Sequence, residues 1–258
     1  MTEIMIADFV IWFLIFMRIF AAFLAAPVFN SASIPMIIKV LLSVFIAYIA
    51  FLSLDKTHIQ VDTRFLALAL LAIKELITGL LMGFCVNLVF HGIAFAGMFI
   101  GQDMGLSMAN VFNPTEGTDA NVIGEVFNIL AILLFFLIDG HHYIIRGVVS
   151  SLKVVPLGSY TLNSAVFDLF IKYTAAVFVI AVKIASPIMV SFFLVHLAEG
   201  IVARVIPQIQ VFFVTQPLMI GAGLLFIISL LPVYVYFIKY LLKSYEDLLF
   251  GLIRAMGG

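Results

Sequence analysis

Charged residues are scarce in this sequence: Asp, Glu, Lys and Arg make up only 10% of its 258 residues. Soluble domains are usually about one quarter charged. The chain is also 65% hydrophobic, with a mean hydropathy of +1.27. One core of this size cannot bury that much apolar surface. Lipid or partner subunits must cover the rest, so the composition predicts an integral membrane protein.

Cysteine is nearly absent as well, because Cys85 is the only one. A disulfide framework or a cysteine-based metal cluster within the chain is therefore excluded. The net charge of -1 and the lack of a basic stripe argue against a nucleic-acid partner. The sequence also lacks a phosphate-binding Walker loop, a pair of zinc-binding histidines one helical turn apart, and a serine nucleophile elbow. We therefore expect a protein that is not an enzyme and has no cofactor or bound metal.

Long apolar runs are what the sequence has in abundance. They show no alternation, which is typical of membrane helices rather than strands. The six runs cover about 9–26, 37–54, 65–101, 122–138, 165–198 and 217–242. Polar stretches separate them at 27–36, 55–64, 102–121, 139–164 and 199–216. The first run follows acidic rather than basic residues, so we expect a retained helix and not a cleaved leader. The predicted fold class is an all-α membrane protein with one domain.

Two runs, 65–101 and 165–198, do not resemble ordinary membrane spans. A helix over residues 65–101 would be about 55 Å long, whereas a hydrocarbon core is about 30 Å thick. Charges also lie inside the runs, among them Arg18, Lys74 and Glu75. A charge at the centre of a lipid-facing helix costs about 2.5–3.5 kcal/mol. We expect these charges to face protein or a polar cavity, or to lie outside the lipid. Long helices bent into hairpins within an oligomer would account for both features.

The charges also suggest ion pairs. Lys74 and Glu75 are neighbours in the sequence, so they do not face each other on a helix. We expect their partners to be Asp103, Arg146 or a charge on a neighbouring subunit. Glu199 is expected to form a structural ion pair with Arg204.

Glycines four residues apart form two ladders, Gly79 with Gly83 and Gly97 with Gly101 and Gly105. Glycines at this spacing line one face of a helix and let another backbone approach closely. Either an intersubunit face or packing within the chain would explain them.

The stretch 106–121 joins apolar residues to turn-forming ones. Leu106, Met108 and Phe112 are apolar, whereas Asn113 and Pro114 begin a turn. One interpretation is a helix end packed on its neighbours. The other is an apolar plug across a pore, for which the flexible thioether of methionine is well suited.

Asp139, His141 and His142 have the side chains of a metal site or a proton relay. However, adjacent histidines on a helix are expected to point in different directions, and no third histidine is nearby. We favour a polar helix end with capping and packing roles.

Five stretches, in order along the chain, resemble one known family. They are Arg18 with Pro27 and Pro35-Met-Ile-Ile-Lys39, residues 74–84, residues 96–109 with Asn113-Pro114, Asp139-Gly-His-His with Ser151 and Pro156-Leu-Gly158, and Arg204-Val-Ile-Pro-Gln208 with Pro217. On these residues the chain resembles the FliR family of type III secretion, whose members in virulence injectisomes are the SctT proteins.

The resemblance implies an export-gate subunit of the flagellar secretion apparatus. Such a subunit would join FliP and FliQ in a shallow helical ring, raised out of the bilayer plane within the basal body at the bacterial inner membrane. Residues 1–160 would be the FliP-like part and 161–258 the FliQ-like part, and the stretch 106–121 would contribute to the closed-pore plug. FlhB and FlhA would be further partners and unfolded flagellar proteins the cargo, with an outside ATPase and the proton-motive force driving export.

Two other functions compete with this one. A secondary transporter of a small solute would need paired half-helices near the midplane. The glycine-rich segment 97–105 offers one such break, without a convincing counterpart in the other half. A membrane-embedded enzyme would use Asp139, His141 and His142.

Overall fold

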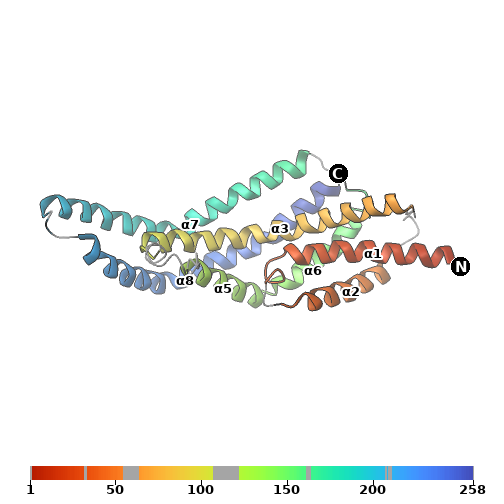
Figure 1. Ribbon diagram of the computed structural model, residues 1–258, viewed down its shortest axis with the longest axis horizontal. Coiled ribbons are helices and arrows are strands. Elements are labelled where there is room, and N and C mark those ends of the chain that lie inside the picture. The colour runs from red at the N-terminus through yellow and green to blue at the C-terminus, as the bar shows by residue number, and fades with distance from the viewer. Residues whose placement is uncertain are drawn as a thin grey trace. The chain divides into compact units, whose positions relative to one another are not determined.

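The computed structural model describes residues 2–31, 34–54, 64–106, 122–160, 164–206, 208 and 211–257. In these ranges the chain is almost entirely helical. The helices are α1 (Thr2–Ala25), α2 (Met36–Ser53), α3 (Phe65–Asp103), α5 (Val122–Leu137), α6 (Gly140–Val154), α7 (Ser164–Val205) and α8 (Val211–Gly257) (Figure 1).

Five of these helices are long and apolar enough to cross a membrane, and six spans result if the bent pair α5 and α6 counts as one. The predicted all-α membrane class is thus confirmed. Helices α3, α7 and α8 have 39, 42 and 47 residues, which makes α8 about 70 Å long. The chain bends by 72° between α5 and α6. Helices α3 and α7, in contrast, each continue as one helix.

Pro187 lies inside α7 without ending it. A proline in a helix removes the N–H that would bind the carbonyl four residues earlier, here that of Lys183. The Ser186 hydroxyl donates a hydrogen bond to this carbonyl at 3.1 Å. A neighbouring serine side chain thus replaces the missing donor, as membrane helices require.

The expected polar stretch 139–164 contains a further helix, α6, and treating it as a connection was wrong. Its overall hydropathy is too low for the sequence pattern to suggest a span. However, Ile144, Val148 and Leu152 recur every four residues, and all three are buried. A single apolar stripe of this kind is enough to pack an amphipathic helix against its neighbours.

The chain divides into two compact units built from interleaved segments. Unit 1 comprises Met1–Leu88, Phe136–Thr174 and Leu242–Gly258. Within it, α1 packs along α2 and also contacts α6 (Figure 1). Its fully buried side chains come from α1, α2, α3, α6 and the end of α8, among them Leu14, Ile15, Arg18, Phe23, Met82, Tyr245 and Ile253. The core of unit 1 thus includes a charged residue.

Unit 2 comprises Val89–Phe135 and Ala175–Leu241. Its core is apolar and aromatic. Phe127 of α5 meets Tyr234 of α8 edge to face, with ring centroids 5.2 Å apart, and Phe192 of α7 meets Phe226 of α8 in the same way at 6.1 Å. Such aromatic pairs contribute about 0.5–1.5 kcal/mol each beyond their burial.

Large apolar side chains are exposed along most helices. Examples on α2, α7 and α8 are Phe45, Leu194, Ile201, Leu225 and Ile228, each more than 60% exposed. Water would be a poor solvent for so much apolar surface. The structure therefore requires lipid or other protein against these faces.

Candidate functional site

A buried charge cluster joins three helices of unit 1. The Arg18 guanidinium, on α1, forms a two-pronged ion pair with the carboxylate of Glu75 on α3, at 2.5 and 3.0 Å. Its remaining nitrogen donates to the Ser151 hydroxyl of α6 at 3.3 Å and to the Val155 carbonyl at 2.9 Å. Arg18, Glu75 and Ser151 are all fully buried. Every nitrogen of the guanidinium therefore has an acceptor, as a buried charge needs.

The loop after α6 is fixed to the same cluster. The Gly158 N–H donates to the Glu75 carboxylate at 2.7 Å, and the Lys74 ammonium donates to the Gly158 carbonyl at 3.1 Å. Gly158 has a φ of +71°, and a Cβ there would overlap the Leu71 side chain. Only glycine suits this backbone. The adjacent residues Lys74 and Glu75 thus bind the backbone carbonyl and the backbone N–H of Gly158.

The expected partners of Lys74 and Glu75, namely Asp103 and Arg146, are not the ones observed. Arg18 is the ion-pair partner of Glu75 instead, 57 positions away in the sequence. The roles of Ser151 and Gly158 were also missed. Both residues belong to a stretch that resembles the known family, but nothing in the sequence indicated that they would bind Arg18 and Glu75.

Gly79 and Gly83 lie where α3 touches the backbone of α1. A Cβ at Gly79 would overlap the carbonyl oxygen of Arg18, and one at Gly83 would overlap that of Ala22. Both glycines therefore pack within the chain, and they bring α3 close enough for Glu75 to reach Arg18.

The second ladder divides into different roles. A Cβ at Gly97 would lie 2.6 Å from the Ile123 carbonyl oxygen of α5, so Gly97 marks a close helix contact within unit 2. Gly101 is buried. Gly105, expected on the same face, lies beyond the end of α3 at a φ of +74°. The Leu106 N–H binds the Gly101 carbonyl and the Gly105 N–H binds that of Gln102, at 3.0 and 2.8 Å. This is a Schellman motif, in which Gly105 ends the helix.

Met104, just before the stretch 106–121, is held against α8. Gln216 donates a hydrogen bond from its side-chain nitrogen to the Met104 carbonyl at 2.9 Å. The fully buried Met104 side chain fills the space that a Cβ on Gly223 would occupy. Leu106 is half-buried, whereas Met108, Phe112, Asn113 and Pro114 lie outside the described residues. Gln216, a lone amide at the start of an apolar run, was not foreseen.

The expected ion pair between Glu199 and Arg204 is wrong. Glu199 binds His196 at 3.0 Å, and Arg204 is exposed. Residues five apart lie on different sides of a helix, whereas residues three apart are neighbours. Asp103 is half-buried at the end of α3.

Asp139, His141 and His142 lie together at the bend between α5 and α6. Their potential ligand atoms are all within 4.8 Å of one another, and the two imidazole centroids are 4.1 Å apart. The expectation that the histidines point apart was wrong. Asp139 is the N-cap of α6, yet its side chain makes no capping hydrogen bond, so the expected capping role is wrong as well.

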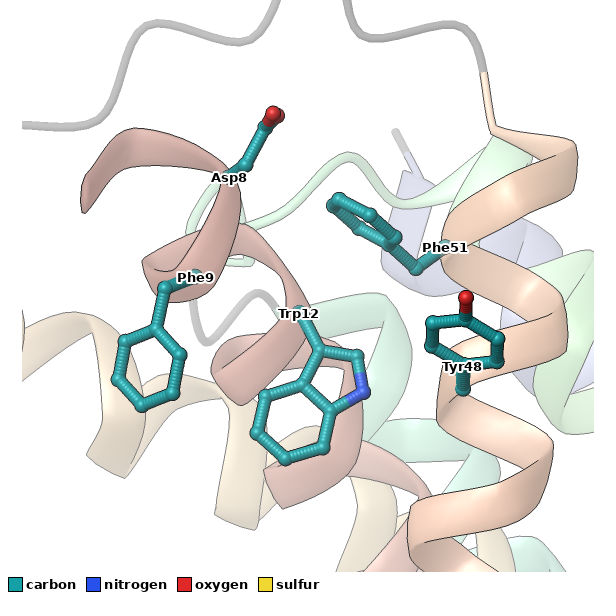
Figure 2. A pocket seen from close by; sticks show the side chains of 5 residues that line it. All are labelled: Asp8, Phe9, Trp12, Tyr48 and Phe51. Carbon is teal, nitrogen blue, oxygen red and sulfur yellow. The ribbon is translucent and has the colours of Figure 1, made fainter. Parts of the chain in front are cut away.

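A shallow aromatic pocket lies between α1 and α2. Figure 2 shows Phe9 and Trp12 from α1 and Tyr48 and Phe51 from α2 around it, with Asp8 at one side. Phe9 and Trp12 begin a row of neighbouring rings along α1, some stacked and some tilted, that continues through Phe13, Phe16 and Phe20. The lining of this pocket is thus aromatic apart from Asp8. The charge cluster consists of an ion pair and hydrogen bonds that connect helices of unit 1. Its role in the fold is therefore structural.

Comparisons with known proteins identify the family to which this chain is similar. The family described as "Bacterial export proteins, family 1" matches residues 9–245. The flagellar biosynthetic protein FliR of Bacillus subtilis is 34% identical over 85% of this chain and 85% of its own. FliR of Pectobacterium carotovorum is 32% identical over 93% and 92%, and FliR of Escherichia coli is 28% identical over 93% and 91%. The chain therefore belongs to the FliR family of bacterial export proteins.

Proposed function

We propose that this chain is an export-gate subunit of the flagellar type III secretion apparatus. The match to the export family along residues 9–245 carries the proposal, and the relatives compared above are flagellar biosynthetic proteins. The subunit would join FliP and FliQ in a channel for unfolded flagellar proteins, beside FlhB and FlhA, in the basal body at the inner membrane. Its part in this channel would be structural and not enzymatic.

Two features of the structure support a role inside an assembly. Helices α7 and α8, with 42 and 47 residues, exceed the roughly 20 residues that cross a bilayer. They also carry many of the exposed apolar side chains. Neighbouring subunits would cover the parts that lipid does not reach. In this proposal residues 1–160 take FliP-like positions and residues 161–258 FliQ-like ones.

The transporter alternative is less well supported. Its proposed half-helix break at 97–105 falls within α3, which continues to Asp103. Among the described residues one bent helix pair occurs, α5 with α6, whereas inverted repeats would give two.

Co-expression tests the proposed function. The full chain is purified in mild detergent with and without the FliP and FliQ proteins of the same organism, and native mass is measured. We expect one discrete large complex that forms only when all three are present. A monodisperse particle of this chain alone, unchanged by the other two, would contradict the gate and favour a transporter.

Shortening the stretch 106–121 tests the proposed plug. We expect the three-protein complex to assemble and, in liposomes, to leak ions, because the apolar side chains no longer seal the pore. The matched control keeps the length and Pro114 but changes Met108 and Phe112 to serine, which should leak as well if apolar sealing is the cause. Unchanged ion permeability in both complexes would contradict the plug while leaving the gate proposal intact.

A further inference from the structure

The turn between α5 and α6 collects three metal-binding side chains in one place. Asp139 has a left-handed backbone, with a φ of 56° and a ψ of 29°. The His142 N–H donates to the Asp139 carbonyl at 3.0 Å, which closes the turn. This conformation places residues 139, 141 and 142 on the same side of the bend.

The three side chains are close enough to share one ion. Their ligand atoms lie within 4.8 Å of one another, and the Asp139 carboxylate is 3.6 Å from Nδ1 of His142. Ligands bound to one tetrahedral zinc ion at about 2.0–2.2 Å lie about 3.3–3.6 Å apart. Small side-chain rotations would bring the three to that spacing without moving the backbone.

The three side chains make few other interactions among the described residues. Nδ1 of His141 is buried without a hydrogen-bond partner among the described residues, although buried polar atoms normally have one. The Asp139 side chain is 71% exposed and that of His142 is 59% exposed, so an ion can reach them. The Phe136 ring, 5.3 Å from that of His141, restricts the histidine from the other side.

We propose that Asp139, His141 and His142 bind one divalent transition-metal ion, with Zn²⁺ preferred. Two imidazoles and one carboxylate are ligands typical of zinc, whereas Mg²⁺ and Ca²⁺ select oxygen ligands only. Water would complete the coordination. The ion would connect the N-cap of α6 to its first turn and so stiffen the start of this helix. This inference does not depend on the export function.

Metal titration of the full chain tests the site. The protein is purified with an affinity tag free of histidine, stripped with a chelator, and titrated with Zn²⁺ against a chromogenic competitor. We expect one equivalent per chain. The changes Asp139→Asn, His141→Gln and His142→Gln should each weaken the affinity by at least about 10-fold, since changing even an outer-shell partner costs 10–100-fold.

His91→Gln and His196→Gln are the matched controls, because both histidines lie away from the bend in the sequence and His196 already binds Glu199. They should keep full affinity. X-ray absorption of the zinc-loaded unchanged protein gives a readout that needs no variant, and two imidazoles in the nearest shell are expected. Absence of stoichiometric binding, equal affinity in all the variants, or a shell without imidazole would overturn the proposal.

Discussion

Replacing Arg18 by methionine is expected to lower the free energy of unfolding of unit 1 by about 3–5 kcal/mol. The change leaves the fully buried Glu75 carboxylate with an unpaired charge. It also removes the donors that reach Ser151 and Val155. Thermal or denaturant unfolding in detergent can follow the loss through Trp12, the only tryptophan, which lies on α1.

A double variant separates the charge from the packing. Arg18→Met with Glu75→Leu removes both charges and should recover most of the loss, because a buried pair is often replaceable by apolar residues. The free energy of unfolding of the double variant should remain about 1–3 kcal/mol below that of the unchanged protein, since the Gly158 N–H loses its acceptor. Arg204→Met, at an exposed arginine, is the matched control and should be nearly neutral. An Arg18→Met effect no larger than that of the control would contradict the importance of the cluster.

We expect a second large loss of stability when Gly79 and Gly83 are changed together to alanine. Each added Cβ would overlap a backbone carbonyl oxygen of α1, which cannot rotate away as a flexible side chain could. We expect α1 and α3 to separate, with a loss of at least about 3 kcal/mol for the pair. The same unfolding measurement detects it.

Gly200 and Gly221 provide the control for this experiment. Both lie in helices, and nothing lies within 4 Å of a Cβ added at either position. Alanine there should be neutral or stabilising by up to about 1 kcal/mol, because it favours the helix. Equal outcomes for the two pairs of glycines would show that the close contact with α1 has no energetic importance.

Features that depend on local sequence were predictable, and those that depend on distant contacts were not. Apolar runs predicted the membrane helices because a long helix satisfies its own backbone. The charge on Arg18 predicted that it faces protein or a polar cavity, or lies outside the lipid, and of these the structure shows the first. Its partner Glu75 could not be predicted, since nothing in either neighbourhood specifies a contact 57 residues away.

The candidate site shows the same division at shorter range. The spacing of Gly79 and Gly83 indicated a close contact, yet not that α1 provides it. Gly105 fits the second ladder, with Gly97 and Gly101, although the chain turns there and the glycine ends the helix. The metal-binding side chains at the bend were recognised by type, but a regular helix geometry gave the wrong directions for the two histidines.

The order of the charge cluster along the chain has a consequence for synthesis. Arg18 is made first, Glu75 57 residues later and Val155 137 residues later. At about 5–20 residues per second, the arginine waits roughly 3–11 s for its counterion. During that time α1 carries an unpaired charge that is costly to place in lipid. The first helix must therefore stay beside water or the insertion machinery until α3 arrives.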